Sequence, residues 1–148
     1  MTIRRLFSKD PNDEEENVTQ NIYVFRFILF CIIVYSFEML LNSVDIFIVD
    51  KTIFTRGYVT GCLFAAVYVL ILLHLGLEHP LTKYVSITAV SLIIMAASVS
   101  LTYHMIIIIM MPIIIAGMYT SKQLSIYTFV LTVLSIIIST YAGYYYGV

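Results

Sequence analysis

Two groups of side chains in this sequence could carry chemistry. In the first, His74, Glu78 and His79 form an HxxxEH pattern. His74 and Glu78 stand one helical turn apart and could share a metal ion or a proton. The spacing differs from the HExxH pattern of zinc proteases. We therefore interpret the group as a hydrogen-bonded or ion-paired cluster in which Arg26 is a partner for Glu78, and keep metal binding as the alternative.

The second group is a set of polar residues that three different connections would bring to one level of a membrane. Ionisable residues at membrane depth are candidates for function, and a small ligand could bind between helices at such a mouth. The alternative is a set of interfacial residues that merely face water. The members of this predicted outer mouth are Glu38, Asn42, Asp45, Arg56, Tyr58, Tyr103 and His104.

No set of residues with the spacing of a known catalytic motif is visible. The chain has no glycine-rich phosphate loop and no GxSxG or CxxC pattern. We therefore predict no catalytic residue, no cofactor and no enzyme within these 148 residues. The two cysteines, Cys31 and Cys62, lie inside apolar runs and are interpreted as small buried side chains. A net charge of −1 gives no indication of a nucleic-acid surface.

The elements that position these residues are predicted to be membrane-spanning helices. Hydrophobic residues make up 61% of the chain and charged residues 11%, against roughly half and a quarter in soluble domains. The excess lies in long runs, and the mean hydropathy is +0.97, which predicts an all-α polytopic bundle in the lipid bilayer. We expect a polar tail over residues 1–20 and a transmembrane domain over 21–148. Its spans are predicted near 21–41, 58–77, 83–101, 104–119 and 124–146.

The positions of Lys and Arg predict how the chain is oriented. With alternating spans, one side of the membrane receives all of these residues except Lys51 and Arg56. The positive-inside rule then places the N-terminus in the cytoplasm. We expect a multi-pass protein of the cell (inner) membrane. An odd number of spans places Val148 outside.

Small residues predict where helices pack closely, because they let two backbones approach. In the second span they recur every four residues. In the last span, small hydroxyl residues alternate by three and four along one face, and these could instead line a polar path. In the fourth span, Pro112 is expected to kink the helix because it removes a backbone donor. The packing residues are Gly57, Gly61 and Ala65 in the second span and Ser125, Thr128, Thr132, Ser135 and Ser139 in the last.

The last third of the chain carries a resemblance to a known family. It reads TYH, an apolar span with a central proline, then YTSKQLSIYTFVLTVLSIIIS and a terminal GYYYG. This pattern resembles the N-terminal multi-pass membrane region of clostridial-type bacterial proteins in which a GGDEF output domain, a diguanylate cyclase, follows the membrane part. The match is best over residues 85–148. The residues that carry it are Tyr103, His104, Pro112, Ser121, Lys122, Tyr127 and the ending from Gly143 to Gly147.

The resemblance implies a sensory input module of cyclic di-GMP signalling that works as a homodimer. A GGDEF domain is absent from this sequence, so no catalytic residue is carried over. The family would also need another span after Gly147 to return its output domain to the cytoplasm. We keep two alternatives: a self-contained subunit of a channel or transporter, and an effector that assembles in the membrane.

Overall fold

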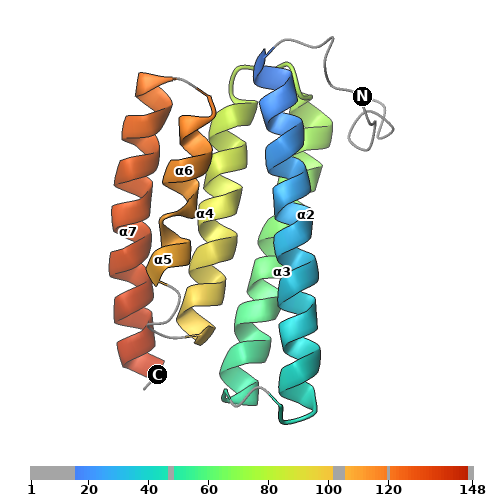
Figure 1. Ribbon diagram of the computed structural model, residues 1–148, viewed down its shortest axis with the longest axis vertical. Coiled ribbons are helices and arrows are strands. Elements are labelled where there is room, and N and C mark those ends of the chain that lie inside the picture. The colour runs from blue at the N-terminus through green and yellow to red at the C-terminus, as the bar shows by residue number, and fades with distance from the viewer. Residues whose placement is uncertain (1–15, 47–48, 102–105, 120, 147–148) are drawn as a thin grey trace.

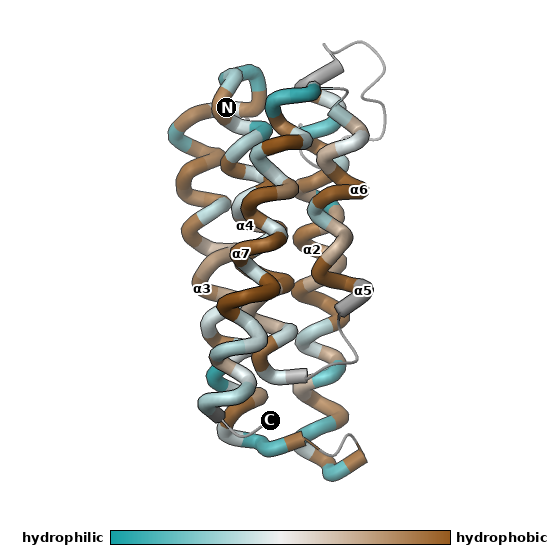
Figure 2. Tube along the Cα trace, turned by 90° about the vertical axis from the view of Figure 1, so that its left-hand side faces the viewer, coloured by the Kyte–Doolittle hydropathy of each residue, from teal (hydrophilic) through white to brown (hydrophobic). Residues whose placement is uncertain are grey.

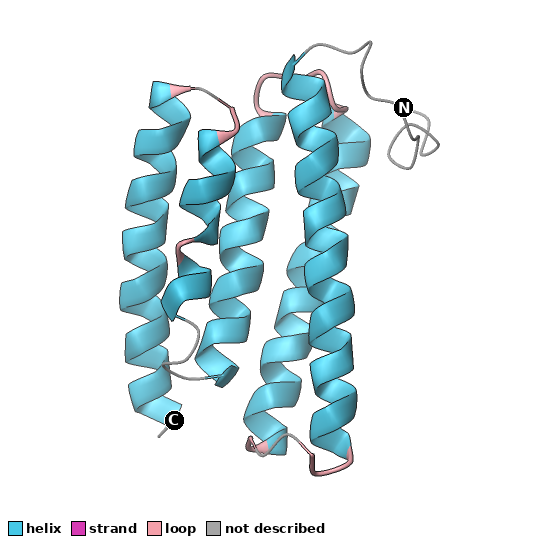
Figure 3. Cartoon of the chain, viewed as in Figure 1, coloured by secondary structure: helices cyan, strands magenta, loops and turns pink. Residues whose placement is uncertain are grey.

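A computed structural model describes residues 16–46, 49–101, 106–119 and 121–146. Helices make up nearly all of this part, and it contains no strand (Figure 3). The long helices are α2 (Glu16–Ser43), α3 (Lys51–Leu75), α4 (Thr82–Leu101) and α7 (Lys122–Tyr146). Two short helices, α5 (Ile106–Ile109) and α6 (Met111–Gly117), lie between α4 and α7 in the sequence.

The four long helices have the length and the apolar composition of membrane-spanning segments. Each contains a stretch that is long and apolar enough to cross a membrane: Val18–Ser43, Lys51–Leu75, Thr82–Ser100 and Lys122–Tyr145. Hydrophilic residues gather at the two ends of the bundle, with hydrophobic residues between them (Figure 2). Many large apolar side chains point outward, among them Phe30 at 61% exposure, Leu70 at 66% and Phe129 at 60%. The prediction of a multi-pass helical membrane bundle is therefore confirmed.

The helices run alternately up and down around α4. We call the two ends of the bundle the amino end, where α2 and α7 begin, and the carboxyl end, where they finish (Figure 1). Helix α4 contacts all the others: α2 and α3 pack on one side of it, and α5, α6 and α7 on the other. Helices α4 and α7 run parallel, and the α5–α6 segment returns between them toward the amino end (Figure 1).

The second span begins earlier than the sequence predicted. Helix α3 starts at Lys51, ahead of the predicted start near residue 58. The reason is a cap: the Asp50 carboxylate accepts hydrogen bonds from the backbone N–H groups of Thr52 and Ile53, each at 2.9 Å. Such a cap satisfies donors that the first helical turn otherwise leaves unpaired.

The predicted fourth span, 104–119, differs most from the expectation. Its residues 104 and 105 lie outside the described part, and the rest forms α5 and α6 with a break at Met110. Neither is long enough to count among the four spanning helices. Pro112 stands in the first turn of α6. Because it has no N–H to give to the carbonyl of Ile108, the ladder of hydrogen bonds is interrupted there.

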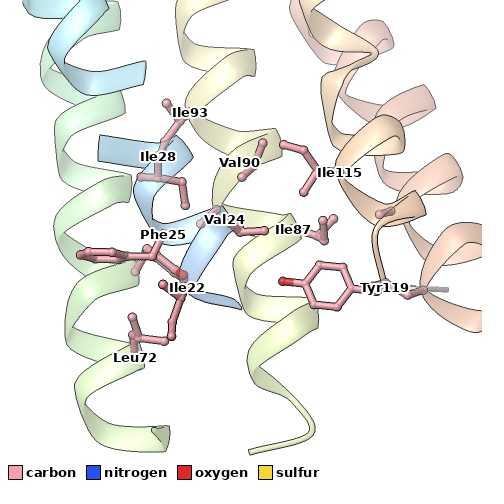
Figure 4. Packing of buried hydrophobic residues seen from close by; sticks show 14 of the residues in the cluster. Ile22, Val24, Phe25, Ile28, Leu72, Ile87, Val90, Ile93, Ile115 and Tyr119 are labelled. Carbon is pink, nitrogen blue, oxygen red and sulfur yellow. The ribbon is translucent and has the colours of Figure 1, made fainter. Parts of the chain in front are cut away.

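The buried core lies where α2 and α3 meet α4. Val24 and Ile28 of α2 face Ile87, Val90 and Ile93 of α4 (Figure 4). All five are at most 3% exposed. Only α4 is buried along most of its length, which fits its central position. The other long helices turn one stripe inward and leave the rest of their apolar surface for lipid.

Candidate functional site

A buried asparagine joins three parts of the chain at the amino end. Asn21 of α2 is 1% exposed. Its side-chain N–H donates to the backbone carbonyl of Leu77 at 2.8 Å, and its oxygen accepts from the Tyr119 hydroxyl at 2.8 Å. The neighbouring Gln20 donates to the carbonyl of Met118. These bonds tie α2 to the α3–α4 connection and to the end of α6. We call this set of contacts the Asn21 network.

Helices α3 and α4 are joined nearby by two further polar contacts. The Tyr68 and Ser86 hydroxyls lie 3.1 Å apart, and both residues are fully buried. The Thr82 hydroxyl donates to the carbonyl of Gly76 at 2.7 Å. Gly76 has φ of +84°, a conformation that glycine adopts without the strain a side chain would add. The turn between the two helices is therefore fixed by both backbone and side chain.

Toward the carboxyl end, α2, α3 and α4 meet at Tyr35. The Tyr35 hydroxyl lies 2.8 Å from the Ser100 hydroxyl of α4. Its ring packs edge-on against Phe54 and Tyr58 of α3, with centroids 5.3 and 5.4 Å away. Gly57 leaves the space for this contact, because a Cβ at that position would come within 2.8 Å of both hydroxyl oxygens.

Three members of the predicted outer mouth have partners close to them. The Asn42 side chain donates to the carbonyl of Val49 at 2.9 Å and closes the α2–α3 connection. The Asp45 carboxylate accepts from the Lys51 amine at 2.7 Å, with both side chains exposed. The Tyr58 hydroxyl lies 2.9 Å from that of Ser36. These contacts account for all three as parts of the scaffold.

The remaining members do not share one pocket. Glu38 lines a groove between α2, α4 and the α5–α6 segment. Arg56 lines a different groove, between α3 and α4, together with Thr60. Tyr103 and His104 lie outside the described residues. The predicted single mouth is thus divided into two grooves over the part that the structure describes.

The groove beside Glu38 is one of two grooves of about the same volume in the described structure, and it is the one whose lining includes an acidic side chain. It has a volume of about 200 Å³. Its lining is largely apolar, and Glu38 is the charged residue among those that line it. The Asn21 network lies beyond its amino end, where α2 meets the end of α6. We call it the α2 groove. Its defining residues are Phe27, Phe30, Val34 and Glu38 of α2, Ala97 of α4 and Met111 of α6.

The two predicted packing faces lie as follows. Gly61 is buried, with the Tyr35 ring 3.5 Å from the point where a Cβ would stand, and Ala65 is half-buried beside the main core. On α7, four of the five hydroxyl residues are buried and Ser125 is exposed. Helix α7 packs on α4 and on the α5–α6 segment. The Ser139 hydroxyl lies 2.8 Å from that of Ser98. The buried residues of that face are Thr128, Thr132, Ser135 and Ser139.

The HxxxEH group is spread along the amino end. His74 is exposed on the last turn of α3. The His79 ring nitrogen accepts from the backbone N–H of Leu81 at 3.2 Å. Within the described ranges, no three His, Cys, Asp or Glu side chains stand close enough to hold a metal ion. A pairing of Arg26 with Glu78 stays a prediction.

The Asn21 network is the feature that sequence reasoning missed. Its partners are 56 and 98 residues away along the chain. One signal was available: an asparagine beside a long apolar run costs free energy in a membrane unless its amide is paired.

Comparisons of the chain with protein-family models, curated proteins and solved structures found no match.

Proposed function

We propose that this chain is a membrane-embedded input module. In this proposal it lies in the inner membrane with its amino end toward the cytoplasm, and changes in helix packing regulate a cytoplasmic signalling output. The observation that carries the proposal is the way α2 is held. Side-chain hydrogen bonds fix it at Asn21 and at Tyr35, and the α2 groove opens between and beyond these two points.

This arrangement gives a physical route from one membrane face to the other. Asn21 and Tyr35 are separated by roughly 21 Å along the helix axis. Helix α2 is continuous between them, so a ligand that widens the groove would tilt α2 as a unit. The Asn21 network would then move the end of α6 and the α3–α4 connection, which face the cytoplasm in this orientation. Input modules need such an element with two arrangements.

The nature of the output rests on the family resemblance. It points to a diguanylate cyclase that works as a pair, and therefore to a homodimer of the membrane part. The alternative of a channel draws less support, because the hydroxyl face of α7 is buried inside the bundle apart from Ser125. A path along those hydroxyls would require α7 to separate from the helices that it packs on.

The test is whether a change in the groove reaches the amino end. Ala97→Phe would fill the floor of the α2 groove. Spin labels at Tyr23 of α2 and Gln123 of α7, both exposed at the amino end, report the distance between the two helices. The chain is reconstituted in nanodiscs, in a background without the two native cysteines. We expect Ala97→Phe to shift or broaden the distance distribution.

Ala66→Phe controls for the added bulk of the side chain, because Ala66 is exposed on α3 and is not among the residues that line the groove. It should leave the distribution unchanged. Identical distributions for the unsubstituted chain and both variants would contradict the proposal. A selective ion flux through liposomes that contain the unsubstituted chain would instead favour the channel alternative.

A further inference from the structure

The α2 groove has a chemical asymmetry that suggests its ligand. One wall and the floor are apolar, from Phe27 and Phe30 to Ala97. Glu38 is a carboxylate at the carboxyl-end side of the same groove, within the spanning stretch of α2. Phe27 and Glu38 are roughly 16 Å apart along the helix axis. The α2 groove is therefore apolar along most of its length and has one acidic group at its carboxyl-end side.

Glu38 has no partner within the described part of the chain. No hydrogen bond or ion pair to it is formed there, although it is only half-exposed. Of the basic residues at this end of the bundle, Lys51 is bound to Asp45, and Arg56 lines the other groove. Acidic side chains at membrane depth are costly and are usually paired. A partner from outside the described chain would remove that cost.

We propose that the α2 groove binds a cationic amphiphile, with its apolar chain along Phe27, Phe30 and Val34 and its amine against Glu38. The inference deepens the proposed function and depends on it for its meaning, because it names the class of signal that the input module would receive. Charge complementarity selects this occupant. An anionic lipid would be repelled by Glu38, and a neutral amphiphile would leave the carboxylate without a counter-ion.

The shape of the groove agrees with a chain-like ligand. Its volume of about 200 Å³ is below the roughly 300–1,000 Å³ of pockets that enclose compact small molecules. An open groove of this size accommodates part of an extended hydrocarbon chain. The ligand would enter sideways from the bilayer, where amphiphiles are concentrated.

The absence of tryptophan from the sequence allows a direct test. Phe30→Trp places a single fluorophore in the groove, and Phe129→Trp places one on the outer face of α7. The two positions are matched in residue type and in exposure, at 61% and 60%. Each variant of the full chain is reconstituted in phosphatidylcholine vesicles. Quenching is then measured with a brominated octadecylamine and with the corresponding brominated octadecanol.

We expect the amine to quench Phe30→Trp at a bilayer concentration about fivefold lower than the alcohol, the size of effect that a partly exposed ion pair produces. Phe129→Trp should be quenched equally by both probes. Adding Glu38→Gln to Phe30→Trp should abolish the preference for the amine. This substitution keeps the size of the side chain and removes only its charge.

Three results would overturn the proposal. One is equal quenching of Phe30→Trp by the two probes, and another is a preference for the amine that survives Glu38→Gln. The third is no quenching by either probe, which would mean that another helix or a second copy of the chain covers the groove. The distance measurement between Tyr23 and Gln123 uses no amine, so it can succeed where this test fails. If the amine binds but the distance between Tyr23 and Gln123 does not respond to Ala97→Phe, the ligand proposal stands and the input function is refuted.

Discussion

Gly57→Ala should destabilise the protein because one methyl group has no room there. The new Cβ would lie 2.8 Å from the Ser100 Oγ and from the Tyr35 hydroxyl oxygen, and 2.9 Å from the Ser100 Cβ. Overpacking of this kind costs roughly 1–3 kcal/mol. Separating the two hydroxyls would cost about 1 kcal/mol more. The better helix propensity of Ala offsets roughly 0.5–1 kcal/mol, so we expect the free energy of unfolding to fall by about 1–3 kcal/mol.

Gly61→Ala is the matched control, one turn along the same helix and facing the same tyrosine. Its Cβ would stand 3.5 Å from the nearest atom of the Tyr35 ring, which is an ordinary contact distance. Its free energy of unfolding should stay the same or rise by up to about 1 kcal/mol. The assay is a denaturant titration in mixed micelles, followed by the reactivity of the native thiols. The reasoning would be refuted if Gly57→Ala lay within about 0.5 kcal/mol of the unsubstituted chain, or if both variants lost stability equally.

Two further substitutions test the buried polar groups in the same assay. Asn21→Leu should lower the free energy of unfolding by roughly 1–3 kcal/mol, because it removes the side chain that pairs with the buried Tyr119 hydroxyl and with the carbonyl of Leu77; an unchanged value would contradict a stabilising role for the Asn21 network. Thr132→Val should be neutral or stabilising, since the Thr132 Oγ1 is buried without a partner within the described part. Ser98→Ala should instead lower the stability by about 0.6 kcal/mol, because it breaks the hydrogen bond to Ser139. A larger loss of stability for Thr132→Val than for Ser98→Ala would contradict the assigned contacts.

The helices themselves could be predicted from the sequence, because helix formation here depends on the local run of apolar residues. Runs of about 20 apolar residues have no stable alternative to helix in a bilayer. The start of α3 was placed too late because the helix was read from hydropathy alone. The signal for its true start is Asp50, whose carboxylate caps two backbone donors. Pro112 correctly marked the fourth span as irregular, although the break falls just before it, at Met110.

The site could be predicted only in part, because the position of a residue along a helix gives its depth and not the direction in which it points. Glu38 and Arg56 were placed at one membrane level, yet they line different grooves. The partners of Asn21 could not be read from spacing at all, since Tyr119 is 98 residues away. Contacts of that kind depend on how whole helices pack, which no local pattern specifies.

The most direct test of the account is a topology map, because the input function requires the two ends of the bundle to face opposite sides of the membrane. Single cysteines at Leu81, Lys122, Val44 and Tyr144, all exposed, are placed in a cysteine-free background and labelled on intact cells with a membrane-impermeant maleimide. We predict labelling at Val44 and Tyr144, and protection at Leu81 and Lys122 until the cells are opened. Labelling of Lys122 together with Val44 on intact cells would contradict the account, because the α5–α6 segment would then not cross the membrane.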